Sequence, residues 1–247
     1  MELKVLIIPD IHGELFWTYA KDHLKEYDKV IFLGDYLDAW DDLGISDIEM
    51  LENLNDIIRF KRENYNKVEL LYGNHEFSYI DESFKCSGYR PLMANDARRI
   101  LRENKDIFNI SYQYNNYLFS HAGVVKSWIR DYSHVLEEYR EKDDVYPSDP
   151  LNKIVDTRHF RCYNVISRKR GGISKYGSPI WADMQELATG CGINNFTQIV
   201  GHTPYKHNRI LFKKFDKSSV LFCDIGKPIE LIIYSESLFT YKTLYDK

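Results

Sequence analysis

The sequence predicts an α/β fold made of two packed β-sheets with helices on their outer faces. Three short apolar runs, at residues 4–8, 30–33 and 68–72, each end at a turn and have the length of a buried strand. A helical apolar pattern lies between the second and third runs, and it opens on a capping box formed by Ser46 and Glu49. This alternation of strand and helix indicates a parallel sheet covered by helices.

The remaining elements are predicted from the same patterns. Further helices are expected at residues 14–26, 91–104 and 128–141. A polar, irregular stretch at residues 142–179 follows the last of these helices. It indicates an insertion or cap at about residues 125–180 within a single domain of residues 1–247. Mostly hairpin-linked strands are expected near the carboxyl end, at residues 197–200, 210–215, 220–223, 230–234 and 238–245.

Composition and charge exclude several classes of protein. With 44% hydrophobic residues the chain can bury a full core, and a net charge of −4 leaves no positive field to hold a long nucleic acid. A membrane helix needs about 18 consecutive apolar residues, and no apolar run approaches this length. The amino-terminal apolar run is also too short for a signal peptide. Both observations favour a cytoplasmic protein. The four cysteines are far apart and lack a C-x-x-C motif, so a thiolate zinc site is not indicated.

Polar residues with metal-ligating side chains follow five of the apolar runs. Carboxylates and imidazoles without thiolates suit Mn²⁺, Mg²⁺, Fe²⁺ or Zn²⁺. Each fragment alone could be an ordinary turn sequence or a histidine without a functional role. The preference of turns for such residues does not account for five such fragments in this order, each after an apolar run. The fragments are Asp10-Ile-His12-Gly13, Gly34-Asp35-Tyr-Leu-Asp38, Gly73-Asn74-His75-Glu76, Ser120-His121 and Gly201-His202-Thr203-Pro204.

This ordered set resembles the signature of the calcineurin-like metallophosphoesterase superfamily, in particular its phosphoprotein phosphatase branch, over residues 10–204. The resemblance implies a four-layer α-β-β-α sandwich with two divalent metal ions at the strand ends. Manganese is favoured, and iron, zinc, magnesium and nickel are alternatives. The implied ligands are Asp10 and His12 for the first ion, Asp35 as a bridge, and Asn74, His121 and His202 for the second ion.

The resemblance also implies a catalytic pair. His75 would protonate the leaving alkoxide, and Asp38 would orient His75 and keep it protonated. A neighbouring carboxylate raises the pKa of a histidine, so the pairing is chemically sensible. A metal-activated hydroxide would attack phosphorus in line.

Two arginines usual in that branch are missing, because Ala39 and Tyr72 occupy their places. Arginine matches phosphate oxygens by bidentate geometry, so substitutes are expected elsewhere. Residues 157–182 contain no acid and are the obvious source, although a solvated basic loop would have the same composition. The candidate clamps are Arg158, Arg161, Arg168 and Arg170.

The motifs specify how phosphorus is attacked and leave the substrate open. The last motif lacks the Gly-His-x-His of nucleases and many phosphodiesterases, and residues 34–58 carry acids without Lys or Arg, which disfavours a long phosphate backbone. A Ser/Thr-type protein phosphatase is the first hypothesis. A hydrolase of diadenosine polyphosphates or cyclic nucleotides is the alternative, and a catalytically silent scaffold is the non-enzyme alternative. The sequence does not decide the oligomeric state.

Overall fold

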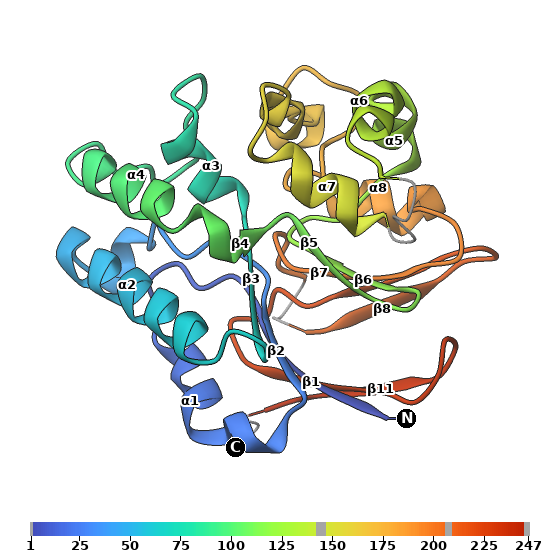
Figure 1. Ribbon diagram of the computed structural model, residues 1–247, viewed down its shortest axis with the longest axis horizontal. Helices are drawn as coiled ribbons and strands as arrows, with labels where there is room; N and C mark the ends of the chain where they lie inside the picture. Colours follow the sequence, from blue (N-terminus) through green and yellow to red (C-terminus); the bar gives the residue numbers. More distant parts are fainter. Residues whose placement is uncertain (1, 142–146, 206–208, 245–247) are drawn as a thin grey trace. The chain divides into compact units, whose positions relative to one another are not determined.

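The computed structural model describes residues 2–141, 147–205 and 209–244. The chain forms two compact units, and each contains one β-sheet (Figure 1). Unit 1 comprises Met1–Phe108 and Ile225–Lys247, and unit 2 comprises Asn109–Asp224. Two sheets flanked by helices confirm the predicted α/β fold class.

The sheet of unit 1 has the strand order β11-β10-β1-β2-β3-β4. Strands β1, β2 and β3 are parallel, as predicted, while β10 pairs with β1 and with β11 in antiparallel fashion. Most residues of the central strands β1, β2 and β3 are aliphatic and buried, as expected of strands covered on both faces, whereas Lys4, Lys29 and Glu69 are half-buried. The strands are β1 (Leu3–Ile8), β2 (Lys29–Phe32), β3 (Val68–Leu71), β4 (Phe108–Asn109), β10 (Ile229–Ile233) and β11 (Phe239–Thr243).

Helices α1, α2 and α4 lie on one face of this sheet (Figure 1). The capping box of Ser46 and Glu49 starts α2, as predicted. The helix expected at residues 14–26 is instead three short segments, since the backbone leaves the helical region at His23 (φ −112°, ψ 9°). The helical segments are η1 (Phe16–Thr18), α1 (Tyr19–His23), η2 (Leu24–Glu26), η3 (Asp41–Leu43), α2 (Asp47–Glu63), α3 (Asn74–Ile80), α4 (Ala94–Glu103) and η4 (Lys105–Ile107).

The sheet of unit 2 has the strand order β5-β6-β7-β9-β8. Its three inner strands are parallel, and the edge strands β5 and β8 are antiparallel to their neighbours. Only part of the predicted hairpin pattern is therefore correct: β8 with β9, and β10 with β11, are antiparallel neighbours in sequence. The strands are β5 (Ser111–Tyr114), β6 (Tyr117–Ser120), β7 (Thr197–Val200), β8 (Leu211–Lys214) and β9 (Ser219–Phe222).

Short helices and loops make up the segment at about residues 125–180, of which residues 142–146 lie outside the described part of the chain. The helix expected at 128–141 is two helices, because Tyr132 has non-helical dihedrals (φ −107°, ψ 16°). Unit 2 contains α5 (Lys126–Asp131), α6 (Ser133–Glu138), α7 (Ser148–Ile154), η5 (Phe160–Asn164), η6 (Arg168–Arg170), α8 (Met184–Glu186) and η7 (Leu187–Cys191).

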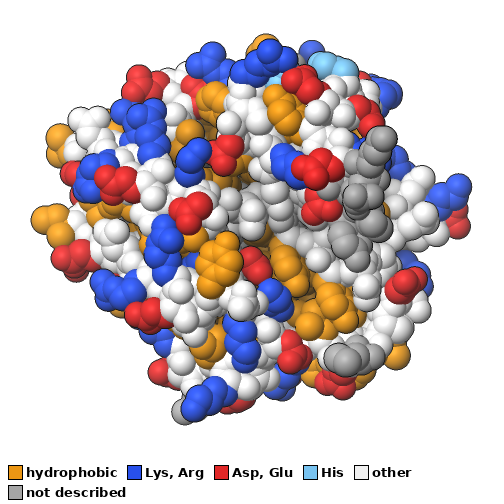
Figure 2. Space-filling model, viewed as in Figure 1, with side chains coloured by type: hydrophobic (Ala, Val, Ile, Leu, Met, Phe, Trp, Pro, Cys, Tyr) orange, Lys and Arg blue, Asp and Glu red, His pale blue; other side chains and the backbone are white. Residues whose placement is uncertain are grey.

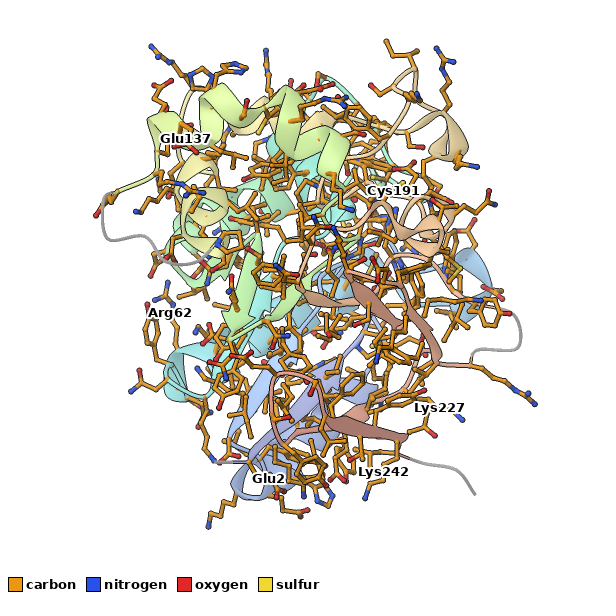
Figure 3. All side chains as sticks on the ribbon, turned by 90° about the vertical axis from the view of Figure 1, so that its right-hand side faces the viewer. Glu2, Arg62, Glu137, Cys191, Lys227 and Lys242 are labelled. Atoms are coloured by element: carbon orange, nitrogen blue, oxygen red, sulfur yellow. The ribbon has the colours of Figure 1, made fainter. Side chains whose placement is uncertain are left out.

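Three further observations concern the charged side chains, the lengths of the helices and the exposure of the cysteines. Lys and Arg side chains are interspersed with Asp and Glu over the face drawn in Figure 2. Among the described helices, none is both long enough and apolar enough to cross a bilayer. Cys191 of η7 is exposed (Figure 3), whereas Cys86, Cys162 and Cys223 are buried.

Two glycines allow the loops after β2 and β3 to approach each other closely. Gly34 has φ +108°, and a Cβ atom there would lie 2.5 Å from the backbone nitrogen of Gly73. A Cβ atom on Gly73 would in turn overlap the Asp35 carboxylate. Glycine is the residue that fits these two positions.

We expect Gly34→Ala to lower the free energy of unfolding by at least about 3 kcal/mol, because both the positive φ and the contact with Gly73 are unfavourable for alanine. Gly44 is a matched control: it also has positive φ (+65°), but no heavy atom lies within 4 Å of its added Cβ. Gly44→Ala should cost about 1–2 kcal/mol. Urea unfolding of both variants measures the difference, and equal losses would show that the close approach is unimportant.

Candidate active site

The predicted site residues of unit 1 lie in the loops that follow three adjacent parallel strands. Because carboxyl ends of parallel strands meet at one edge of a sheet, the loops converge there. One ligand atom each of His12, Asp35 and His75 lie within 4.8 Å of one another. The predicted residues after β1 are Asp10 and His12, those after β2 are Asp35 and Asp38, and those after β3 are Asn74 and His75.

Asp35 is at the centre of this group. Its Oδ2 lies 3.9 Å from His12 Nε2 and 3.8 Å from His75 Nε2. Its Oδ1 accepts a hydrogen bond from the backbone nitrogen of His75 at 3.0 Å. Asp35 is 2% exposed and Asp10 is 6% exposed, so both carboxyl groups lie in the interior. Buried carboxylates beside imidazoles are typical of a cation site.

His12 is held in the form that binds metals. Its Nδ1 lies 3.0 Å from the carbonyl oxygen of Leu37, and a carbonyl only accepts, so Nδ1 carries the proton and Nε2 offers a lone pair. Burial is the main cause that lowers the pKa of His12, and the nearby His75 lowers it further. His12 is therefore neutral near pH 7.

His75 is held in the opposite protonation state. Its Nδ1 lies 2.8 Å from Asp38 Oδ2. Burial by itself would lower the pKa of His75, but the charges of Asp35 and Asp38 and the hydrogen bond to Asp38 outweigh it and raise the pKa to about 9. The structure therefore pairs a protonated imidazole with a buried carboxylate, the arrangement expected of a general acid.

Tyr79 also contacts this pair, a role that the sequence motifs did not reveal. The Tyr79 hydroxyl donates a hydrogen bond to Asp38 Oδ1 and accepts one from the backbone nitrogen of Arg90 at 3.1 Å. Both oxygens of Asp38 are thus engaged, one by His75 and one by Tyr79. His75 and Tyr79 are four residues apart on α3, and this helical spacing was the available signal.

A contact with Cys86 orients the side chain of Asn74. The amide nitrogen of Asn74 donates to Cys86 Sγ at 3.1 Å, and its amide oxygen is a ligand-type atom for a divalent ion. Cys86 in turn contacts the backbone oxygen of Asn74, and burial raises the pKa of this thiol. Cys86 is therefore a protonated, buried group that orients Asn74.

Glu76 is a second residue whose role the sequence did not reveal. It is fully buried, and its carboxylate accepts backbone hydrogen bonds from Asp35 (3.0 Å), Tyr36 (2.8 Å) and Gly73 (3.0 Å). Burial and the charge of Asp35 raise the pKa of Glu76 to about 7. Glu76 thus ties the loop after β2 to the loop after β3.

Unit 2 brings together its own two predicted ligands. His121 follows β6 and His202 follows β7, and these strands are parallel neighbours. His121 Nε2 lies 3.0 Å from His202 Nδ1, and both side chains are buried. When two histidine nitrogens bind the same metal ion, each lies about 2.1 Å from the ion, and the two nitrogens are about 3 Å apart. The pair therefore fits a shared ion.

The four candidate phosphate clamps lie in different surroundings within unit 2. Arg170 reaches the His202 loop: its Nη2 donates to the Thr203 hydroxyl, and its Nε lies 3.1 Å from Asp183 Oδ2. Arg158 instead pairs with Glu138 on the surface, and Arg168 donates to the Ile173 carbonyl. Arg161 lies over the Phe160 ring. Arg170 thus contacts a loop that carries one of the sequence motifs.

Several of these residues have left-handed backbone conformations that are costly for side chains with a Cβ. The φ values are +45° for His12, +51° for Asp35, +62° for Asp38 and +66° for His202. The other non-glycine residues with positive φ in the described chain are two asparagines, which tolerate this region well. Strain of this kind concentrates at functional sites, where it fixes the direction of a side chain.

An α/β fold whose parallel strands end in buried imidazole and carboxylate groups is typical of proteins with a divalent-metal site at the strand ends. Comparison with family models assigns the chain more narrowly. The chain belongs to the calcineurin-like phosphoesterase family, whose model matches residues 3–206. It is therefore a metal-dependent phosphoesterase, and the resemblance stated from the motifs is confirmed.

The chain is similar to several solved structures, and two of them, with TM-scores of 0.54 and 0.50, share its fold. A point mutant of a cold-active protein tyrosine phosphatase has a TM-score of 0.54 at 18% identity, covering 98% of this chain and 80% of that one. Another structure of a cold-active protein tyrosine phosphatase has a TM-score of 0.50 at 20% identity and covers 98% and 78%. A metallophosphoesterase from Sphaerobacter thermophilus has a TM-score of 0.48 at 12% identity and covers 98% and 89%. No match was found among curated proteins.

Replacement of Glu76 by glutamine should destabilise the protein by about 2–4 kcal/mol. A glutamine side chain has one acceptor oxygen, so its NH₂ group would face backbone N–H donors that the glutamate now satisfies. Glu63→Gln is the control, because Glu63 is an exposed residue of α2, a helix that covers the same sheet. Urea unfolding tests the difference, and a loss below about 0.5 kcal/mol for Glu76→Gln would contradict the tie between the two loops.

Proposed function

We propose that the protein is a binuclear metal-dependent phosphatase that hydrolyses phosphate monoesters on proteins, of the Ser/Thr type. The observation that carries the proposal is the protonated His75, fixed by Asp38 and lying beside the ligand-type Asp35. A general acid next to metal ligands suits a reaction in which an alkoxide leaves phosphorus.

The donor groups support a metal centre of the predicted kind. His12 offers a neutral lone pair, Asp35 offers a carboxylate, and His121 and His202 offer a matched pair of nitrogens. Such a set without thiolates favours Mn²⁺, with Fe, Zn, Mg or Ni as alternatives. We assign these groups, together with Asp10 and Asn74, to one two-ion centre because the family resemblance implies it. Divalent ions bound there would supply the positive charge that activates water and stabilises the transition state.

The chain's own residues perform the proton transfer. His75 holds a proton on Nδ1, which Asp38 accepts as a hydrogen bond, and a second on Nε2. The Nε2 proton passes to the departing oxygen of the substrate. Asp38 stabilises the imidazolium before transfer, and Tyr79 prevents Asp38 from turning away. Neutral His75 then recovers a proton from solvent.

Arg170 is the strongest candidate to bind the phosphate group. Its contact with Thr203 places the guanidinium in the loop that carries His202. Asp183 pairs with Nε and leaves part of the guanidinium fork for a phosphate oxygen. Arg158 pairs with Glu138 and Arg168 donates to the Ile173 carbonyl, so we assign the clamp to Arg170.

A panel of substrates tests the function directly. We expect turnover of an aryl phosphate monoester and a phosphoserine peptide with Mn²⁺, and loss of both activities after chelation. A bis-aryl diester should be a poor substrate. A dinucleoside polyphosphate hydrolysed faster than either monoester would instead support the nucleotide alternative, and metal binding without any turnover would support the scaffold alternative.

His75→Ala tests the role of the general acid. With an activated aryl phosphate, kcat should fall about 10²- to 10⁴-fold while metal content is unchanged. The loss should be larger with an alkyl phosphate, because a poor leaving group depends more on protonation. Steady-state kinetics with both substrates and metal analysis of the purified variant give the answer. Equal losses with the two substrates would remove the acid role from His75.

A further inference from the structure

A pocket of about 560 Å³ opens in unit 1 beside the loop that carries His12. Gly13 and Glu14, the two residues after His12, line it, and so do residues of η1, η3 and α2. Asn53 joins the pocket to the loop: its amide nitrogen donates to the carbonyls of Gly13 (3.0 Å) and Glu14 (3.1 Å). The pocket is thus fixed relative to His12.

The pocket has an apolar wall that water reaches. Leu15 is 62% exposed and Leu43 is 41% exposed, and Ile45 and Trp17 complete this wall. Isolated exposed leucines are common on protein surfaces, but exposed leucines that line the same pocket form a patch that one partner could cover. Trp40 is 50% exposed, and its ring centroid lies 5.5 Å from that of His12, so it adds apolar surface next to this proposed metal ligand.

The rim of the pocket is negatively charged. Four acids line it, and Lys21 is the one cation among its lining residues that the structure describes. Within the described residues, neither Glu14 nor Glu52 has an ion-pair or side-chain hydrogen-bond partner, whereas Glu49 caps α2 and Asp56 pairs with Arg59.

Lys21 shows how a cation fits this surface. Its Nζ lies 4.5 Å from the centre of the Trp17 ring and 3.9 Å from Asp56. A long basic side chain can therefore pack its methylene groups on apolar atoms here and keep its charge near a carboxylate. The same arrangement is available to an incoming lysine or arginine at Glu14 and Glu52, next to Leu15 and Leu43.

We propose that this pocket binds a segment of the substrate protein that carries both basic and apolar side chains. The segment's leucine-like groups would cover the apolar wall, and its Lys or Arg charges would lie at Glu14 and Glu52. The proposal rests on the protein phosphatase activity proposed above and adds a preference: phosphoserine flanked by basic residues is favoured over phosphoserine flanked by acids.

The experiment compares three phosphoserine peptides that differ only in the flanking segment, Lys-Leu-Lys, Gln-Leu-Gln or Glu-Leu-Glu. The native chain should have a kcat/KM about three- to tenfold higher for the lysine peptide than for the glutamine peptide, since exposed charge pairs contribute modestly. The double variant Glu14→Gln with Glu52→Gln should lose this preference. Glu2→Gln with Glu63→Gln removes the same charge at exposed positions outside the pocket and should retain it; Figure 3 labels Glu2.

A second measurement separates the pocket from the catalytic proposal. Calorimetric titration with the unphosphorylated lysine peptide reports binding without turnover, and this binding should weaken in the pocket variant alone and at high salt. Binding without turnover of any phosphopeptide would support the pocket and contradict the phosphatase. Equal binding by both double variants would overturn the pocket proposal, as would a change of oligomeric state in the pocket variant without loss of peptide binding. Glu52→Gln alone, at an exposed position, should show about half the effect if the double variant folds poorly.

Discussion

The buried carboxylate of Glu76 is the interaction on which the site in unit 1 depends. It accepts backbone hydrogen bonds from both strand-end loops, after β2 and after β3. The loops meet so closely that glycine is required at positions 34 and 73. Asp35 is consequently held with one carboxylate oxygen on the backbone of His75 and the other toward two imidazoles. A position within the motif that is not itself a predicted metal ligand thus sets the geometry of the predicted ligands.

The same small region gives its two histidines opposite charges. Burial dominates at His12 and keeps it neutral, whereas the carboxylates around His75 outweigh burial and keep it protonated. The proposed ligand and the proposed acid are therefore the same residue type, and their ring centroids lie 4.9 Å apart. When the surroundings shift the pKa values of two histidines in opposite directions, one site can contain a protonated and a neutral imidazole at the same pH.

The sequence predicted the fold class, the parallel strands and α2 because these depend on local periodicity and capping. It also predicted the residues that unit 1 brings together, since polar residues after parallel strands must meet. The breaks at His23 and Tyr132 were not predictable, because single backbone dihedrals leave no apolar pattern. Glu76 and Tyr79 were missed because their partners are backbone groups and a carboxylate distant in sequence. The single-domain boundary and the individual site roles stay predictions.

The distribution of thiols has a practical consequence. Three cysteines are enclosed, and burial raises the pKa of the Cys162 thiol to about 12, so they are poor nucleophiles. Cys191, on η7 of unit 2, is open to reagents. A maleimide dye or nitroxide would therefore attach at one position of the native chain. Conformational changes during turnover could be followed by spectroscopy without first engineering cysteines out.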